Sequence, residues 1–273
     1  MMNTALMSDR EETVLSQRET PHLSFSRIDR YLHCPEQYRL YYIENLRPRV
    51  LAASLVFGKL IHQALHALFS SKADPVMCFR DSWQAVKQVG LDYSQKESWE
   101  KLNASGQALL EKFLKEELRR LGDIKGSETP FELTISGFDL PLIGVMDLVG
   151  EVDEKRTVVD FKTSGSSYNE HEVILSDQLT TYQLAEPEAE QSAFCVFVKT
   201  KEPKIEWHFA KRGGEQVMEF LGKAGYVARQ ITAGHFYKRS GLWCAWCDYL
   251  PVCTEDKQKA SETLVQIAPA PSP

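Results

Sequence analysis

Two aspartates and a lysine in the middle of the chain have the residue types and spacing that metal-dependent phosphodiester hydrolysis requires. Asp160 and Lys162 are two positions apart in Val159-Asp160-Phe161-Lys162, and Asp147 precedes them by one short hairpin. On a strand, side chains two residues apart leave the same face. We therefore expect a carboxylate and an ammonium to point together to one face of a strand, while Phe161 points the opposite way into the core.

A hairpin that turns at Asp153 and Glu154 would place Asp147 opposite Asp160, with their β-carbons about 5 Å apart. Two carboxylates at that separation repel each other unless a cation lies between them, and all-oxygen ligation suits Mg²⁺ or Mn²⁺. Such an ion can acidify water and neutralise phosphate charge, while Lys162 orients the nucleophile or offsets charge in the transition state. By itself, however, an Asp-x-Lys triplet is also typical of a solvated strand end.

Four cysteines form a second candidate metal site. Cys34 stands near the start of the chain, and Cys244, Cys247 and Cys253 form a C-x2-C-x5-C series near its end. Thiolates select zinc or iron–sulfur clusters, and four of them complete either kind of site. Buried free thiols fit poorly, because three of these cysteines are close together in sequence. A lone cysteine joined to a distant triplet is unlike a zinc finger, but zinc stays the alternative.

Composition limits the classes of function. The 273 residues are 43% hydrophobic, which is ample for a packed core. A net charge of −6 argues against a surface built throughout to coat nucleic acid, and no P-loop motif indicates an ATP motor. No secretory leader or membrane-spanning run is visible. We therefore expect a cytoplasmic protein, whose reduced cysteines bind metal more often than they form disulfides.

The elements that must position these residues change from helices to strands along the chain. Helical periodicity predicts a short helix before Cys34, a helix over Phe57–Phe69 and two further helical stretches up to Leu121, with residues 122–126 closing this half. Strands are predicted over 131–135, 140–149, 157–161, 193–199 and 204–209, with crossover helices over 170–184 and 214–232. Cys195 falls in one of these strands and is expected in the core. The expected fold class is α/β, with a central mixed sheet flanked by helices.

The order of the motifs closely resembles that of RecB-like nucleases in the PD-(D/E)XK superfamily. The resemblance is carried by Gly144-Val145-Met146-Asp147-Leu148, a short hairpin, Val158 to Thr163, and then Gln178-x3-Tyr182. It extends upstream to Gly58-x3-His62 and to the opening Ser24-x-Ser26-x3-Arg30-Tyr31-x2-Cys34-Pro35. The resemblance implies a restriction-endonuclease-like core, with an N-terminal helical region and a C-terminal cysteine segment.

Carried over position by position, the resemblance implies Asp147, Asp160 and His62 as metal ligands and Lys162 as the catalytic lysine. Glu128 is a weaker candidate. These assignments agree with the chemistry that the spacing of Asp160 and Lys162 already indicates.

Two further pairs lie at helical spacing. Gln178 and Tyr182 are one turn apart and share a helix face, so both are expected to reach the scissile strand or to brace Lys162; an ordinary surface pair is the alternative. His66 repeats on the face of His62. Because Gln63 stands where the zinc-peptidase signature needs glutamate, we expect His66 to be structural or solvated.

The cysteine spacing is similar to the 4Fe–4S arrangement of certain RecB-like nucleases, including helicase-associated exonucleases and CRISPR spacer-acquisition nucleases. This resemblance implies a cluster, held by Cys34, Cys244, Cys247 and Cys253, that joins the ends of the domain. The expected function is a Mg²⁺- or Mn²⁺-dependent exonuclease that acts on single-stranded DNA or DNA ends in repair, recombination, replication or CRISPR-type processing. The alternatives are a catalytically silent iron–sulfur DNA-binding module and a zinc-stapled structural protein.

Expected partners are DNA and a helicase or another recombination or CRISPR subunit, without a membrane. The nuclease domain is expected over residues 23–255, with a helical insertion at about 70–125. Polar and low-complexity composition predicts disorder in residues 1–22 and in the tail 256–273, which ends in APAPSP.

Overall fold

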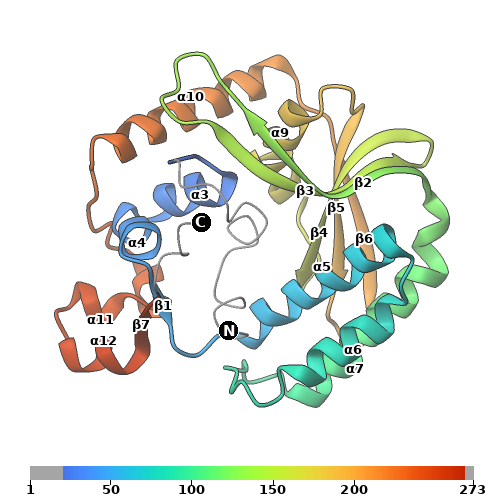
Figure 1. Cartoon of the computed structure of the whole chain (residues 1–273), viewed down its shortest axis with the longest axis horizontal. Coiled ribbons are helices and arrows are strands. Elements are labelled where there is room, and N and C mark those ends of the chain that lie inside the picture. The colour runs from blue at the N-terminus through green and yellow to red at the C-terminus, as the bar shows by residue number, and fades with distance from the viewer. Residues whose placement is uncertain (1–20, 268–273) are drawn as a thin grey trace. The chain divides into compact units, whose positions relative to one another are not determined.

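The computed structural model describes residues 21–267, in which the chain forms two compact units (Figure 1). The sheet unit contains Ala52–Phe131 and Val145–Met218. The terminal unit contains Glu132–Gly144 and the described parts of Met1–Leu51 and Glu219–Pro273. Most of the segment 1–22 and the last six residues lie outside the described chain. None of the helices in the described residues is long and apolar enough to cross a membrane.

A five-stranded mixed sheet with the order β2-β3-β4-β5-β6 confirms the expected α/β fold class. β4 pairs antiparallel with β3 and parallel with β5, and β5 pairs antiparallel with β6. The strands are β2 (Leu121–Leu133), β3 (Leu142–Val152), β4 (Lys155–Ser164), β5 (Gln191–Val198) and β6 (Lys204–Ala210). The central strand β4 carries Asp160 and Lys162.

The β3–β4 hairpin turns where the sequence predicted. Asp153 and Glu154 both have left-handed backbones, with φ of 48° and 65°, as a two-residue type I′ turn requires. The resulting register pairs Leu148 with Val159 and continues in step to the turn. This is the register that the sequence analysis expected, and it fixes which residues of β3 and β4 share a face.

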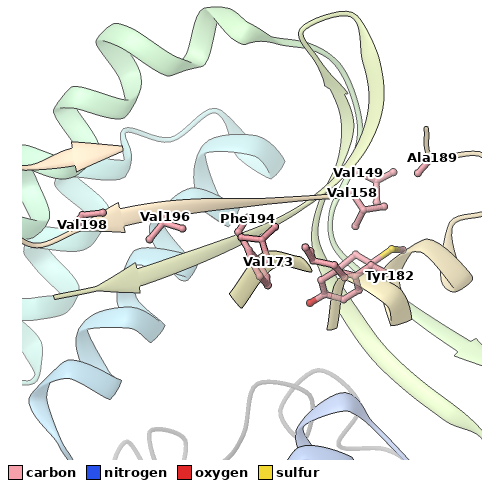
Figure 2. Close-up of a cluster of buried hydrophobic side chains, with 10 residues drawn as sticks. Val149, Val158, Val173, Tyr182, Ala189, Phe194, Val196 and Val198 are labelled. Carbon is pink, nitrogen blue, oxygen red and sulfur yellow. The ribbon is translucent and has the colours of Figure 1, made fainter. Parts of the chain in front are cut away.

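An apolar cluster lies between the strands and two helices, α8 (Glu170–Ile174) and α9 (Asp177–Ala185) (Figure 2). It includes Val158, Val173, Leu179, Tyr182, Phe194 and Val196. The sequence predicted one helix over 170–184, but the helix is broken. Ser176 caps α9 by accepting the Leu179 N–H at 3.3 Å, and an N-cap residue has a non-helical backbone.

The helix α5 (Ala53–Ser71) packs against β4. Phe161 stacks on Phe69 of this helix, with ring centroids 6.1 Å apart, and meets Phe113 edge to face. Because successive strand residues alternate between faces, this packing directs Phe161 toward α5 and its neighbours Asp160 and Lys162 to the opposite side.

Two helices follow α5, namely α6 (Pro75–Ala85) and α7 (Trp99–Lys112). Their contact includes Gly106 of α7, where an added β-carbon would overlap with the Phe79 ring. Phe79 is fully buried and stacks on Trp83, so its ring has little room to move.

The chain after α7 differs from the prediction. Residues 113–117 form a π-helical turn and residues 118–120 a 3₁₀ turn, and β2 starts at Leu121, ten residues before the predicted strand. β2 lies at the edge of the sheet, and most of its side chains are partly exposed. Its two glycines and Pro130 hide the strand pattern, and an edge strand tolerates them.

The terminal unit joins the two ends of the described chain. The strand β1 (Leu46–Pro48) pairs antiparallel with β7 (Leu264–Gln266), and Arg47 faces Val265. The helices α3 (Phe25–His33), α4 (Pro35–Tyr38), α11 (Leu250–Cys253) and α12 (Lys257–Thr263) belong to this unit, as does most of α10 (Gly214–Thr232).

The prediction of disorder from residue 256 was therefore wrong for α12 and β7. Asp256 caps α12 by accepting the Lys259 N–H at 3.0 Å, and Leu264 is 5% exposed. The partner of β7 lies more than 200 residues earlier in the chain, so local composition gives no sign of the pairing.

We predict that Gly106→Ala destabilises the protein although alanine favours helices. The added methyl overlaps with the buried Phe79 ring, which should cost about 1–3 kcal/mol. Gly222 in α10 is the matched control, because no atom lies within 4 Å of its added β-carbon; Gly222→Ala should stabilise by about 0.5–1 kcal/mol. Urea denaturation measures both, and a Gly106→Ala protein as stable as the wild type would contradict the predicted overlap.

Candidate functional site

Asp160 and Lys162 form an ion pair in the middle of β4. The Lys162 Nζ lies 2.8 Å from the Asp160 Oδ2. Asp160 is 2% exposed, whereas the Lys162 side chain is 28% exposed. The two side chains thus share a face, as the strand period predicted, and the ammonium is the more accessible partner.

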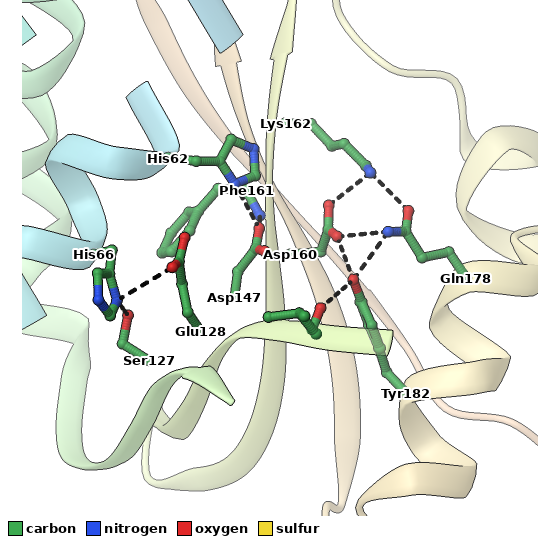
Figure 3. Close-up of polar contacts among 11 residues, drawn as sticks. His62, His66, Ser127, Glu128, Asp147, Asp160, Phe161, Lys162, Gln178 and Tyr182 are labelled. Atoms are coloured by element: carbon green, nitrogen blue, oxygen red, sulfur yellow. Dashed lines mark hydrogen bonds and ion pairs between the residues drawn. The ribbon is translucent and has the colours of Figure 1, made fainter. Parts of the chain in front are cut away.

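Gln178 and Tyr182 of α9 hold this pair from one side (Figure 3). The Gln178 amide donates to the Asp160 Oδ1 at 2.8 Å and accepts from the Lys162 Nζ at 2.6 Å. The Tyr182 hydroxyl donates to the same Asp160 Oδ1 at 2.8 Å. Being one helical turn apart, the two side chains reach the carboxylate together, and Gln178 also contacts Lys162.

Asp147 faces a different set of partners. Its Oδ2 accepts the backbone N–H of Phe161 at 2.7 Å and lies 3.1 Å from the His62 Nδ1. The paired register of β3 and β4 ends at Leu148 and Val159, so the expected direct Asp147–Asp160 pair is not part of the ladder. The Asp147 carboxylate instead accepts a hydrogen bond from the backbone N–H of Phe161, the residue after Asp160.

The charges of this site influence one another. Burial raises the pKa of Asp160, the Lys162 ammonium opposes that rise, and the Asp147 carboxylate adds to it. Burial would lower the pKa of Lys162, but the Asp160 carboxylate outweighs this effect and raises it. Two buried carboxylates thus share one ammonium. A divalent cation would relieve their repulsion, and oxygen donors suit Mg²⁺ or Mn²⁺.

The structure brings only two of the predicted metal ligands, His62 and Asp147, into contact with each other. Within residues 21–267, no three side chains of histidine, cysteine, aspartate or glutamate are close enough to one another to hold a single metal ion. His62 reaches Asp147, while the Asp160 oxygens face Lys162, Gln178 and Tyr182.

His66 has contacts that the sequence analysis did not foresee. Its Nδ1 lies 3.0 Å from the Ser127 Oγ and 4.0 Å from the Glu128 Oε2. Glu128 has a left-handed backbone with φ of 51°. Ser127 carries no motif signal, and backbone handedness at a glutamate cannot be read from a single sequence.

The four cysteines of the predicted cluster line one cavity of about 220 Å³ in the terminal unit. Burial raises the pKa of the Cys247 and Cys253 thiols, and the nearby Cys34 adds to both rises. Trp243 and Tyr249 also line the cavity. Thiolates are the ligand type that zinc and iron–sulfur clusters use, but among the described residues no three of these cysteines are close enough together to hold one metal ion. Cys195, in contrast, is fully buried in β5, as expected.

Comparisons with known proteins show a similar fold and a family. The solved structure of a proposed exonuclease from Eubacterium rectale has a similar fold, with a TM-score of 0.58 and 13% identity over 92% of this chain and 94% of that one. The structure of SSO0001 aligns with a TM-score of 0.47 and 16% identity over 93% of this chain and 96% of that one. None of the curated proteins matches the sequence. The family model of the PD-(D/E)XK nuclease superfamily matches residues 22–254, and the chain therefore belongs to this superfamily.

Proposed function

We propose that the protein is a RecB-like, Mg²⁺- or Mn²⁺-dependent DNA nuclease that acts on single-stranded DNA or on DNA ends. The observation that carries the proposal is the buried Asp160 carboxylate, 2.8 Å from Lys162 and bound to the same Gln178 amide. Membership of a nuclease superfamily supports phosphodiester hydrolysis. The exonuclease function proposed for the Eubacterium rectale protein is consistent with action at ends.

Asp147 and Asp160 would hold the metal ion, with His62 beside Asp147 as the further ligand. When bound, the ion would neutralise phosphate charge and make an attacking water more acidic. The protein itself supplies a buried environment of low dielectric constant, in which electrostatic interactions between fixed charges are stronger than in water.

Lys162 would orient the nucleophile and offset the charge that develops on the phosphate. Its ammonium stays protonated because the Asp160 carboxylate raises its pKa, and its partial exposure leaves it open to substrate. Gln178 fixes the position of Lys162 relative to Asp160, since one amide binds both. A preorganised cation of this kind stabilises a transition state without reorganisation.

The intact pair also favours an enzyme over a catalytically silent DNA-binding module. Keeping two carboxylates buried close together is costly for folding alone. A helicase or CRISPR subunit as partner and a cytoplasmic location remain predictions.

We further propose that Cys34, Cys244, Cys247 and Cys253 hold a 4Fe–4S cluster, with zinc as the alternative. The proposal is supported by the cavity of about 220 Å³ that all four cysteines line.

Asp160→Asn should abolish Mg²⁺-dependent cleavage of end-labelled single-stranded DNA, by at least about a thousandfold, because the amide keeps the shape but loses the charge that binds metal. Asp153→Asn is the matched control. Asp153 belongs to the same hairpin but lies in its turn, where asparagine tolerates a positive φ. Wild-type cleavage by Asp160→Asn would rule the proposed site out, and the product ladder of the wild type distinguishes end cleavage from internal cleavage.

Gln178→Ala should lower kcat by about 10–100-fold with little change in KM, because the amide positions Lys162 and Asp160 without binding substrate. Tyr182→Phe should have a smaller effect, since Asp160 keeps its contacts with Gln178 and Lys162. Steady-state kinetics with single-stranded DNA measure both variants. A rise in KM alone would indicate that Gln178 binds the substrate instead.

Cys34→Ser and Cys247→Ser should lose iron and sulfide alike and melt at similarly lowered temperatures. Both would remove one ligand of a shared cross-link, whose loss costs about 2–5 kcal/mol by analogy with disulfides. Cys195→Ser is the control and should keep its metal content, since this thiol is buried in β5. Full iron in Cys34→Ser with none in Cys247→Ser would disprove a single shared site, and zinc in place of iron would establish the alternative.

A further inference from the structure

The helix α5 presents two histidines, one turn apart, to two different carboxylates (Figure 3). The His62 Nδ1 lies 3.1 Å from Asp147, and the His66 Nδ1 lies 4.0 Å from Glu128. Residues at i and i+4 share a helix face. The two pairs are therefore neighbours, about 6 Å apart along the helix axis, and the second pair is outside the proposed catalytic set.

Two oxygen donors converge at the Nδ1 of the second histidine, which makes three donor groups with the imidazole itself. The Ser127 Oγ lies 3.0 Å from the His66 Nδ1, and the Glu128 Oε2 lies 4.0 Å from the same atom. Around a divalent ion with bonds of about 2.0–2.2 Å, ligand atoms at right angles stand about 3 Å apart, and more widely spread ones about 4 Å. In the structure the first contact is a hydrogen bond and the second an ion pair, and both separations would also suit ligand atoms around one ion.

The backbone of β2 is adapted to make this convergence possible. Successive residues of a regular strand point to opposite faces, so Ser127 and Glu128 could not both reach one side chain. The left-handed backbone of Glu128, with φ of 51°, turns the two adjacent side chains to the same histidine. Strained backbone at a residue other than glycine is characteristic of ligand clamps and active sites.

We propose that His66, Ser127 and Glu128 form a second divalent-cation site, which binds Mn²⁺ in preference to Mg²⁺. One imidazole among oxygen donors is better tolerated by Mn²⁺, because Mg²⁺ favours oxygen ligands and retains its waters. The spacing along α5 exceeds the approximately 3.5–4 Å of paired catalytic ions. An ion here would therefore bind a phosphate next to the scissile one, on the proposed DNA substrate, and would need neither Asp147 nor Asp160.

Mn²⁺ titration of the full-length protein, followed by the electron paramagnetic resonance signal of the free ion, tests the proposal. Mn²⁺ prefers oxygen donors, so the four cysteines should not compete for it. We expect two bound ions in the wild type and one in the Asp147→Asn/Asp160→Asn double variant. Adding His66→Gln to the double variant should remove the remaining ion, and adding Glu128→Gln should weaken it by at least about tenfold.

His208→Gln in the double variant is the matched control. The His208 Nε2 lies 3.5 Å from the Glu206 Oε2, but Ser167 donates to Glu206, so two oxygen donors do not converge on this nitrogen. This variant should keep the ion. The proposal is overturned if the double variant binds no Mn²⁺, or if its ion survives His66→Gln. If instead the wild type does not cleave DNA while the His66-dependent ion persists, the proposed function fails and this site stands.

Discussion

The burial of Asp160 beside Lys162 is the constraint on which the sheet unit depends. Removing the Asp160 carboxylate from water is unfavourable unless its hydrogen-bonding capacity is satisfied. The Gln178 amide and the Tyr182 hydroxyl supply those bonds, and α9 must therefore lie where it does. On the other side of β4, Phe161 packs on α5 and prevents the strand from rotating. His62 lies on the same helix, with its Nδ1 3.1 Å from the Asp147 Oδ2.

The parts of the site that depend on local periodicity could be predicted from the sequence. The strand period gave the common face of Asp160 and Lys162, the helix period gave the pairing of Gln178 with Tyr182, and the predicted turn gave the register of β3 with β4. The observed bounds of α10 agree with the predicted crossover helix. In each case the sequence pattern and the contacts that it predicts lie within one helix, one strand or one hairpin.

The parts that depend on distant partners could not be predicted. β7 is a strand only because β1 pairs with it across the length of the chain, and β2 is an edge strand without apolar alternation. The convergence of Ser127 and Glu128 on His66 requires one backbone angle that no residue type in this segment encodes. The cysteine series, in contrast, stood out in the sequence because three of its members are close together, and the structure places Cys34 at the same cavity.

The two-residue turn at Asp153 and Glu154 constrains the length of the hairpin loop, which is unusual for an exposed loop. Exposed connections generally accept insertions, but a one-residue change here would slide β3 past β4 and move its side chains to the other face. Asp147 would then leave the neighbourhood of Phe161 and His62, although no catalytic residue had been replaced. The length of this solvent-exposed turn is therefore subject to the same selection as the buried carboxylates, and relatives should vary in its composition rather than in its length.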